Sequence, residues 1–202
     1  MKNTLITQST EYDCGMVSMI NALRYLFERA EIRPDLIKSI SLFTLDTFNE
    51  HGEHGRRGTS RGAMMYLSNY FNEYGRIRNF PISSCYLSGS AVNLNENTDI
   101  YQGLQHGGVA VVRCRLEHEE HYVLLTEIAD SGIALFDPYE EIEGYFDGQS
   151  PSSIGVIVVK DEPKRYNRIV TRRILESTEP IDYALGPMEH REAILIFNES
   201  RR

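Results

Sequence analysis

Four residues of this chain could together carry out acyl transfer through a thiol: Gln8, Cys14, His121 and Asp137. In such chemistry a cysteine attacks a carbonyl carbon, a histidine takes the thiol proton and a carboxylate fixes the tautomer of the histidine. The side-chain amide of a glutamine six residues before the cysteine, together with the backbone N–H of that cysteine, can stabilise the oxyanion that develops. The set predicts a thioester acyl-enzyme and requires neither a cofactor nor a metal.

A helix is predicted to hold the thiol. Ile20, Leu23 and Phe27 recur at spacings of three and four residues, as the buried stripe of a helix does, and Cys14 lies at its start. The partial positive charge of a helix N-terminus favours the thiolate form, whereas the acidic residues just before the cysteine oppose it. The alternative is a structural cysteine, because free cysteines are among the most buried residue types.

A β-hairpin is predicted to bring the histidine and the carboxylate together. The second half of the chain holds β-branched stretches at residues 109–116, 121–128 and 133–136. A Ser-Gly turn joins the last two strands, so His121 and Asp137 lie at the same end of the hairpin. The arms differ in length, which requires a bulge or a longer turn near residues 129–130. Taken singly, the histidine could be a strand-end residue and the aspartate a turn former before proline.

Further helices are expected between these two regions. Asp35 is a candidate cap for residues 36–42, and Ser60 is a candidate cap for a helix that Gly75 closes. The polar stretch 49–60 predicts a mobile loop or a lid. Other extended pieces are expected at residues 77–85, 92–94, 154–159, 168–175 and 193–197, with at most a helical turn at 99–105. This order predicts an α+β fold, with an N-terminal helical half packed against an antiparallel β-sheet half.

Composition narrows the classes of function. The chain has 202 residues and a net charge of −8, which disfavours nucleic acid and anionic membranes as partners. Its three cysteines are scattered and form no Cys-x-x-Cys pair, so a reducing compartment is expected. No apolar run has the length of a signal peptide or of a membrane span, which takes roughly 18 residues. These features predict a cytoplasmic protein without a membrane span, and they leave its oligomeric state open.

Two minor patterns have ordinary explanations. His51 and His54 lie in a glycine-containing loop with no further ligand at metal-binding spacing. The basic residues of the tail, Arg165, Arg168, Arg172 and Arg173, fit a solvated strand face better than a nucleic-acid site.

Three motifs carry a resemblance to a known family. They are Gln8-x4-Asp13-Cys14-Gly15 followed by a helix, His121-Tyr122-Val123-Leu124-Leu125, and Phe136-Asp137-Pro138-Tyr139. Together they resemble the double-glycine leader (bacteriocin-processing) peptidases, a family of papain-like cysteine proteases. The resemblance covers about residues 4–160. Val17 stands where the family often has alanine, and the chain shows no nucleotide-binding loop, although family members are often the N-terminal domain of an exporter.

The resemblance implies a papain-like cysteine protease fold and a bacterial thiol peptidase that acts on a peptide or protein substrate. It implies Cys14 as nucleophile, His121 as base, Asp137 as the residue that orients the base and Gln8 as an oxyanion donor. Residues 1–160 would form the peptidase domain, and residues 161–202 a C-terminal extension that adds strands to the same domain. Family members cleave after a Gly-Gly pair.

Two other functions use the same residues. An acyltransferase, or an enzyme that transfers an amide, would resolve the thioester with an amine instead of water. A dry acceptor channel would favour such a transfer, and an open cleft would favour hydrolysis. A catalytically silent binding module is the third possibility, but it has no physical need for all four residues.

Overall fold

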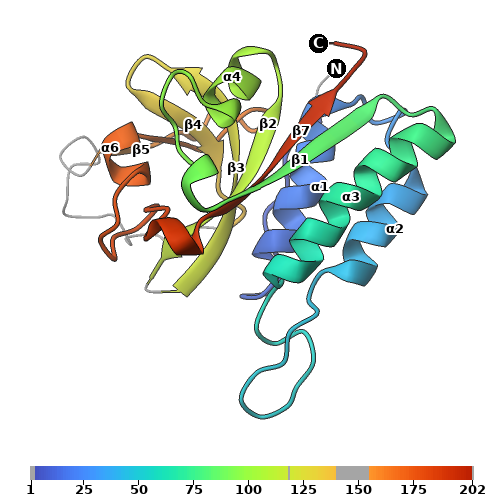
Figure 1. Cartoon of the computed structure of the whole chain (residues 1–202), viewed down its shortest axis with the longest axis horizontal. Coiled ribbons are helices and arrows are strands. Elements are labelled where there is room, and N and C mark those ends of the chain that lie inside the picture. The colour runs from blue at the N-terminus through green and yellow to red at the C-terminus, as the bar shows by residue number, and fades with distance from the viewer. Residues whose placement is uncertain (1–2, 118, 140–154, 202) are drawn as a thin grey trace.

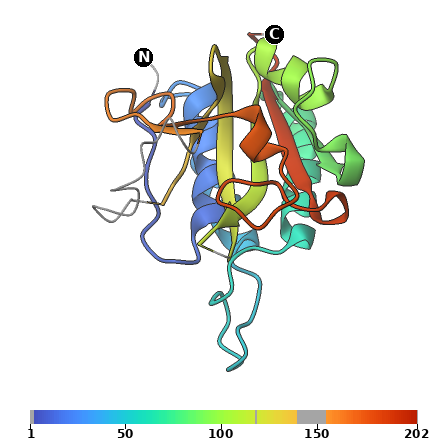
Figure 2. The same cartoon turned by 90° about the vertical axis from the view of Figure 1, so that its left-hand side faces the viewer.

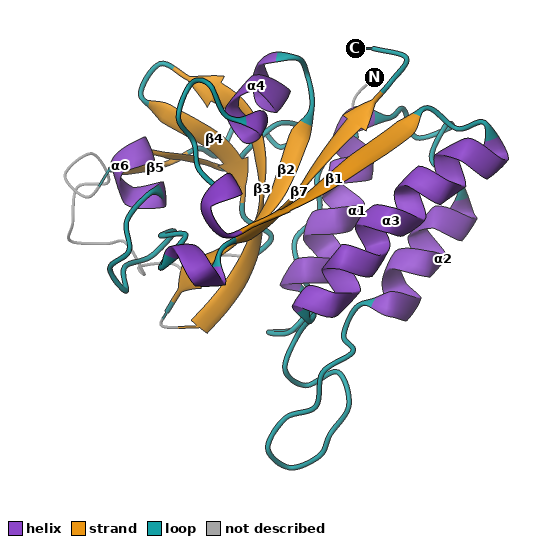
Figure 3. Cartoon of the chain, viewed as in Figure 1, coloured by secondary structure: helices purple, strands orange, loops and turns teal. Residues whose placement is uncertain are grey.

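The computed structural model describes residues 3–117, 119–139 and 155–201 (Figure 1). Within these ranges a seven-stranded sheet has a helical layer on one face and short helices on the other (Figure 3). The helices are α1 (Cys14–Leu26), α2 (Pro34–Phe43), α3 (Arg61–Arg78), α4 (Asp99–Gln105), α6 (Arg172–Leu175) and the 3-10 turns η1 (Gly89–Ala91) and η2 (Met188–His190). No helix within the described ranges is both long enough and apolar enough to span a bilayer.

The strands of the sheet are β1 (Ile82–Ser88), β2 (Val109–Leu116), β3 (Glu119–Ala129), β4 (Gly132–Phe136), β5 (Val156–Val158), β6 (Arg168–Val170) and β7 (Glu192–Asn198). Their order across the sheet is β1-β7-β2-β3-β4-β6-β5, and every neighbouring pair is antiparallel. The predicted α+β fold, with a helical half packed against an antiparallel sheet half, is therefore confirmed.

The sheet is buried on both faces. Val109 and Val111 of β2 pack against the core that lies under α1, α2 and α3. Ala110 and Val112 point to a second core, which α4, α6 and the segment around Tyr183 cover. Alternate residues of one strand thus enter different cores, which explains why β2 is apolar almost throughout.

Helix α3 continues past the glycine that was expected to close it. It ends at Arg78, and Asn79 takes the left-handed conformation with φ 49°. A Cβ on Gly75 would lie 2.5 Å from the Ile82 carbonyl oxygen, so the glycine allows β1 to pass close to the helix. The expected strand at 77–85 consequently begins only at Ile82. The predicted Ser60 cap is confirmed, because its Oγ accepts the Ala63 N–H at 3.1 Å.

The predicted cap of α2 is wrong. Arg33 is the N-cap residue, and Pro34 occupies the first turn, where its missing N–H costs no helical hydrogen bond. The Asp35 carboxylate instead accepts a hydrogen bond from the Tyr74 hydroxyl at 2.8 Å. This bond links α2 to α3.

The hairpin of β3 and β4 forms as predicted, but its bulge lies elsewhere. Ala129 pairs directly with Gly132, so the turn is short, and the register shifts between Leu125 and Glu127. The intervening Thr126 donates its hydroxyl proton to the Ala134 carbonyl at 3.2 Å. The irregularity expected at residues 129–130 is therefore found at Thr126, where a side-chain bond accompanies it.

The tail after residue 160 takes part in the same sheet. The apolar run at 168–175 divides into the strand β6 and the short helix α6. Strand β7 lies between β1 and β2, with its backbone paired on both sides. The run at 99–105, expected to make one turn, forms helix α4. Of the strand expected at 154–159, residue 154 lies outside the described residues and β5 covers Val156–Val158.

Candidate active site

Cys14 is the first residue of α1 and is 6% exposed. The preceding Asp13 turns its carboxylate back into the entering loop. There it accepts hydrogen bonds from the Thr10 backbone N–H at 3.1 Å and from the Thr10 hydroxyl at 2.7 Å. The aspartate thus shapes the loop that leads to the thiol.

Gly15 lets the start of α1 lie close to its neighbours. A Cβ at this position would come within 2.9 Å of Thr59 and within 3.2 Å of the Tyr122 ring. One turn later, the Ser18 hydroxyl donates to the Tyr122 carbonyl at 3.0 Å. These contacts fix the first turn of α1 against β3, the strand that carries His121.

His121 and Asp137 form a buried hydrogen-bonded pair. The distance from His121 Nε2 to Asp137 Oδ1 is 2.7 Å, and both side chains are almost fully buried. Burial by itself lowers the pKa of His121, but the Asp137 carboxylate and hydrogen bonds with Asp137 and Cys14 raise this pKa to about 10. His121 is therefore an imidazolium at neutral pH. With Nε2 bonded to the aspartate, Nδ1 is the ring nitrogen available to the thiol.

Hydrogen bonds fix both the carboxylate and the backbone of Asp137. Its Oδ1 also accepts the Tyr139 N–H at 2.9 Å, and its Oδ2 accepts the Tyr183 hydroxyl at 2.8 Å. The Asn167 side chain bonds both backbone groups of Asp137, at 2.8 and 2.7 Å. Burial raises the pKa of Asp137, but the charge and hydrogen bond of His121 and the hydrogen bonds from Tyr139 and Tyr183 lower it overall. The carboxylate therefore stays ionised inside the protein.

Asn167 and Tyr183 were not found from the sequence. Both lie in the tail, outside the stretch that carries the family resemblance, and neither has a regular spacing to Asp137. Only the pairing of β4 with β6 brings Asn167 beside the aspartate. The sequence contains no local signal for such a contact.

Tyr183→Phe removes the hydroxyl that donates to Asp137 and keeps the shape of the aromatic ring. Loss of the hydroxyl removes one donor to the charged carboxylate, so the pKa of Asp137 should rise, and the free energy of unfolding should fall by about 1–2 kcal/mol. Carboxyl NMR titration and urea unfolding measure the two effects. Tyr166→Phe is the matched control, because the Tyr166 hydroxyl has no hydrogen-bond partner among the described residues. Equal results for the two variants would contradict this role of Tyr183.

Gln8 lies in the same cleft as Cys14 and His121. Its backbone N–H donates to the Pro138 carbonyl at 2.7 Å, which ties the entering loop to the residue after Asp137. One N–H of its side-chain amide donates to the Thr10 carbonyl at 3.0 Å. The amide has a second N–H, so this bond does not prevent it from acting as a donor in the cleft.

The cleft has a volume of about 420 Å³. Gln8, Cys14, His121 and Tyr139 line it, together with Glu11, Tyr12, Arg56, Arg57, Gly58, Leu116, Glu117, Glu119 and Glu120. Asp137 is not among these residues and lies behind His121. One rim belongs to the loop at residues 44–60, which extends away from the body of the molecule in both views (Figures 1 and 2). The Arg56 guanidinium lies over the Tyr12 ring, 5.8 Å from its centre.

The other two cysteines do not line the cleft. Cys85 is exposed on β1, and Cys114 is buried on β2, where it pairs with His121 of β3. His54 packs edge-on against Phe48 with 4.9 Å between ring centres. Within the described residues, no group of three or more His, Cys, Asp and Glu side chains is placed to hold a metal ion.

Comparison with known proteins gives a distant structural likeness. No protein-family model matches this chain, and no curated protein matches it. Among solved structures, the peptidase domain of Streptococcus mutans ComA is similar over 96% of this chain and 98% of that chain, with 12% sequence identity and a TM-score of 0.41. At that score the likeness assigns neither a function nor a site, so the assignment below depends on the geometry of Cys14, His121 and Asp137.

Proposed function

We propose that this chain is a papain-like cysteine peptidase that hydrolyses a peptide through a thioester acyl-enzyme. The observation that carries the proposal is the buried His121–Asp137 pair hydrogen-bonded at 2.7 Å beside a helix-borne Cys14 in an open cleft. A buried carboxylate that orients a histidine next to a thiol is the arrangement that activates a cysteine nucleophile.

The proposed reaction uses each group in turn. Cys14 Sγ, whose proton His121 has taken, attacks the peptide carbonyl carbon. The backbone N–H of Cys14 and the Gln8 amide stabilise the oxyanion. The imidazolium then gives its proton to the leaving amine as the C–N bond breaks, which leaves a thioester and a neutral His121. A water molecule gives a proton to His121 and attacks the thioester, and the released thiolate and imidazolium restore the starting state.

The cleft favours hydrolysis over transfer. Besides His121, six of its lining residues carry charge: Glu11, Arg56, Arg57, Glu117, Glu119 and Glu120. All six are exposed, so water reaches the thioester readily. A transferase would need to keep water away from this intermediate. The resemblance to double-glycine leader peptidases makes a peptide with a Gly-Gly bond the first substrate to try, and a cytoplasmic location stays a prediction.

Alkylation by iodoacetamide tests the proposal without knowledge of the substrate. Mass spectrometry follows the labelling of each cysteine at neutral pH in the native protein and in His121→Ala. Cys14 should be labelled at least about tenfold more slowly in the variant, because the imidazolium that stabilises the thiolate is lost. Cys85 should react equally in both proteins, since it is exposed and lies on β1, which β7 and β2 separate from the strand of His121. An unchanged rate at Cys14 would refute the proposed thiolate–imidazolium pair.

A further inference from the structure

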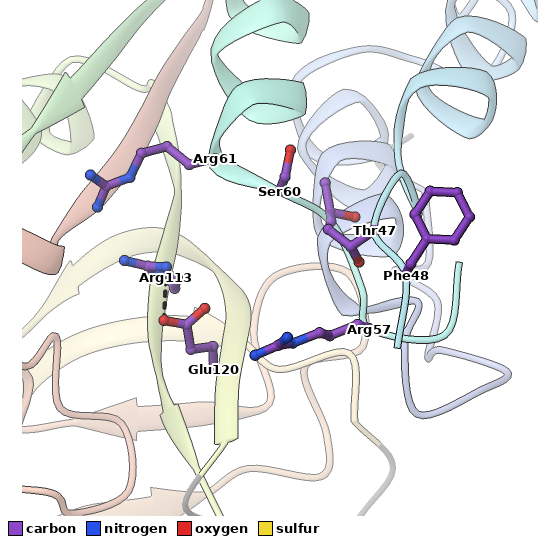
Figure 4. A pocket seen from close by; sticks show the side chains of 8 residues that line it. Thr47, Phe48, Arg57, Ser60, Arg61, Arg113 and Glu120 are labelled. Atoms are coloured by element: carbon purple, nitrogen blue, oxygen red, sulfur yellow. Dashed lines mark hydrogen bonds and ion pairs between the residues drawn. The ribbon is translucent and has the colours of Figure 1, made fainter. Parts of the chain in front are cut away.

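A second pocket adjoins the catalytic cleft. It has a volume of about 390 Å³, and its walls include Arg57, Arg61, Arg113 and Glu120 (Figure 4). Arg57 and Glu120 also line the cleft that holds Cys14. The two hollows therefore share a boundary, and a peptide bound in the cleft could place a side chain in this arginine pocket.

The three arginines come from different parts of the chain. Arg57 belongs to the loop at 44–60, Arg61 begins α3 and Arg113 lies on β2. In Figure 4 the guanidinium groups of Arg61 and Arg113 lie on one side of the pocket, and the Arg57 side chain reaches toward that side from across it. This concentration of positive charge occurs in a protein with a net charge of −8, so the pocket differs in sign from the molecule as a whole.

A buried glutamate orders two of these arginines. Glu192 of β7 is 1% exposed, and its oxygens lie 3.3 Å from Arg113 Nε and 3.5 Å from Arg61 Nε. The hydroxyls of Tyr122 and Tyr86 donate to it at 2.7 and 2.8 Å. One carboxylate thus holds two guanidinium groups side by side and balances the charge of only one of them.

The His190 carbonyl restrains the same pair. It accepts hydrogen bonds from Nη2 of Arg61, at 2.9 Å, and from Nη2 of Arg113. Arg113 is only 14% exposed. These two guanidinium groups are therefore fixed before any ligand arrives, so binding loses little side-chain entropy.

The pocket already accommodates one carboxylate. Glu120 Oε1 lies 2.9 Å from Arg113 Nη1, yet the Glu120 side chain is 73% exposed. The Glu120 side chain thus stays largely in solvent while it pairs with Arg113, so another carboxylate could take its place. Arg57 makes no hydrogen bond or ion pair within the part of the chain that the structure describes. It is thus available to a ligand.

We propose that the arginine pocket binds an acidic side chain, Asp or Glu, of the peptide whose scissile bond lies at Cys14. This inference rests on the proposed peptidase function. Arginine suits the ligand, because its planar guanidinium matches a carboxylate with two parallel hydrogen bonds. Binding there fixes the register of the peptide, because the rest of the cleft carries Glu11, Glu117 and Glu119 and repels an acidic side chain.

The test uses capped synthetic peptides of twelve residues with a central Gly-Gly bond. One residue at a time is varied between Glu and its neutral analogue Gln. Mass spectrometry then gives the rate of cleavage of each member of a pair. At one position, the Glu peptide should be cleaved roughly tenfold faster than its Gln partner, and this ratio should fall as salt is raised. At peptide positions that bind near Glu11, Glu117 and Glu119, the Glu peptide should be cleaved no faster than its Gln partner.

Two variants separate the pocket from general charge effects. Arg57→Gln should reduce the ratio to about twofold or less. Arg56→Gln changes the net charge equally and affects a residue that lines the cleft but not the arginine pocket. It should retain the preference for Glu. If both variants lose the preference, or if the native protein has none at any position, the acidic-residue site is refuted while the peptidase function stands.

If no peptide is cleaved, a measurement of peptide binding tests the arginine pocket separately from the peptidase activity. The same peptide pairs are then passed over immobilised Cys14→Ala protein, with and without Arg57→Gln. Retention of Glu peptides above Gln peptides that depends on Arg57 supports the pocket and counts against peptidase activity. Equal retention of both peptides overturns the pocket as well as the proposed function.

Discussion

Cys14→Ala should abolish peptide cleavage, with turnover reduced by at least about four orders of magnitude. The thiol forms the acyl-enzyme, and neither Cys85 nor Cys114 lines the cleft. The fold should persist, since the change removes one small atom from the start of α1 and leaves the contacts of Ser18 and Gly15 with β3 intact. Cleavage of a labelled peptide measures the activity, and thermal unfolding checks the fold.

The other two cysteines provide the controls. Cys85→Ala changes an exposed residue, and Cys114→Ala changes a buried one that lies opposite His121 on β2. Both variants should keep turnover within a few fold, although Cys114→Ala should lose about 1 kcal/mol of stability through the small cavity it leaves. Loss of activity in Cys114→Ala together with retention in Cys14→Ala would reverse the assignment of the nucleophile.

Asp137→Asn should produce the second large effect, a loss of about 10² to 10⁴ in turnover. The amide has almost the same shape, but it carries no charge to stabilise the imidazolium. Burial, which acts to lower the pKa of His121, would then prevail. The pKa of His121 should fall from about 10 to its ordinary value of about 6.5 or below, so the histidine would be neutral at pH 7.

Histidine NMR measures this change directly. The chain has six histidines, and the His121 signal is identified by its loss in His121→Ala. In the native protein His121 should remain charged up to about pH 10. In Asp137→Asn it should lose its charge below neutrality. A variant that keeps a charged His121 at pH 7 would show that Asp137 does not set its protonation.

The same pair gives stability a defined pH range. The pKa of His121 is raised in the fold, so its contribution is complete below the unfolded value of about 6.5 and is lost as the pH rises toward about 10. The pKa of Asp137 is lowered, so its contribution is present above the ordinary value and disappears as the pH falls. Urea unfolding across pH should therefore show a plateau near pH 5–6, and Asp137→Asn should flatten the decline on its alkaline side.

The strongest local patterns predicted their elements best. The helix predicted to start at Cys14 and the strand predicted at 109–116 both form at those residues, because each is buried along its length and its periodicity is clear. The hairpin argument also placed His121 near Asp137, and the structure gives 2.7 Å between them. The bulge at Thr126 could not be located, since it depends on a hydrogen bond to the partner strand.

Contacts across long sequence separations set the limit of prediction. Gly75 has the sequence signature of a helix end, yet it lies inside α3 because the backbone of β1 passes next to it. The hydrogen bonds of Tyr183 and Asn167 to Asp137 depend on how the tail folds back onto the sheet. Secondary-structure propensity and hydrophobic periodicity depend on residues that are close in sequence, so they do not predict these tertiary contacts. The catalytic roles of Gln8, Cys14, His121 and Asp137 stay predictions until the variants are measured.

The position of β7 between β1 and β2 has a consequence for how the protein is made. Tyr86 of β1 and Glu192 of β7 are bonded across 106 residues, and β2 pairs with the same late strand. During synthesis, the edges of β1 and β2 that pair with β7 stay unpaired until β7 leaves the ribosome. Such edges are prone to join other chains, and assembly from distant segments is slow. Nascent chains of this protein should therefore need chaperones most just before β7 emerges, when the histidine and aspartate strands are complete but the sheet is still open.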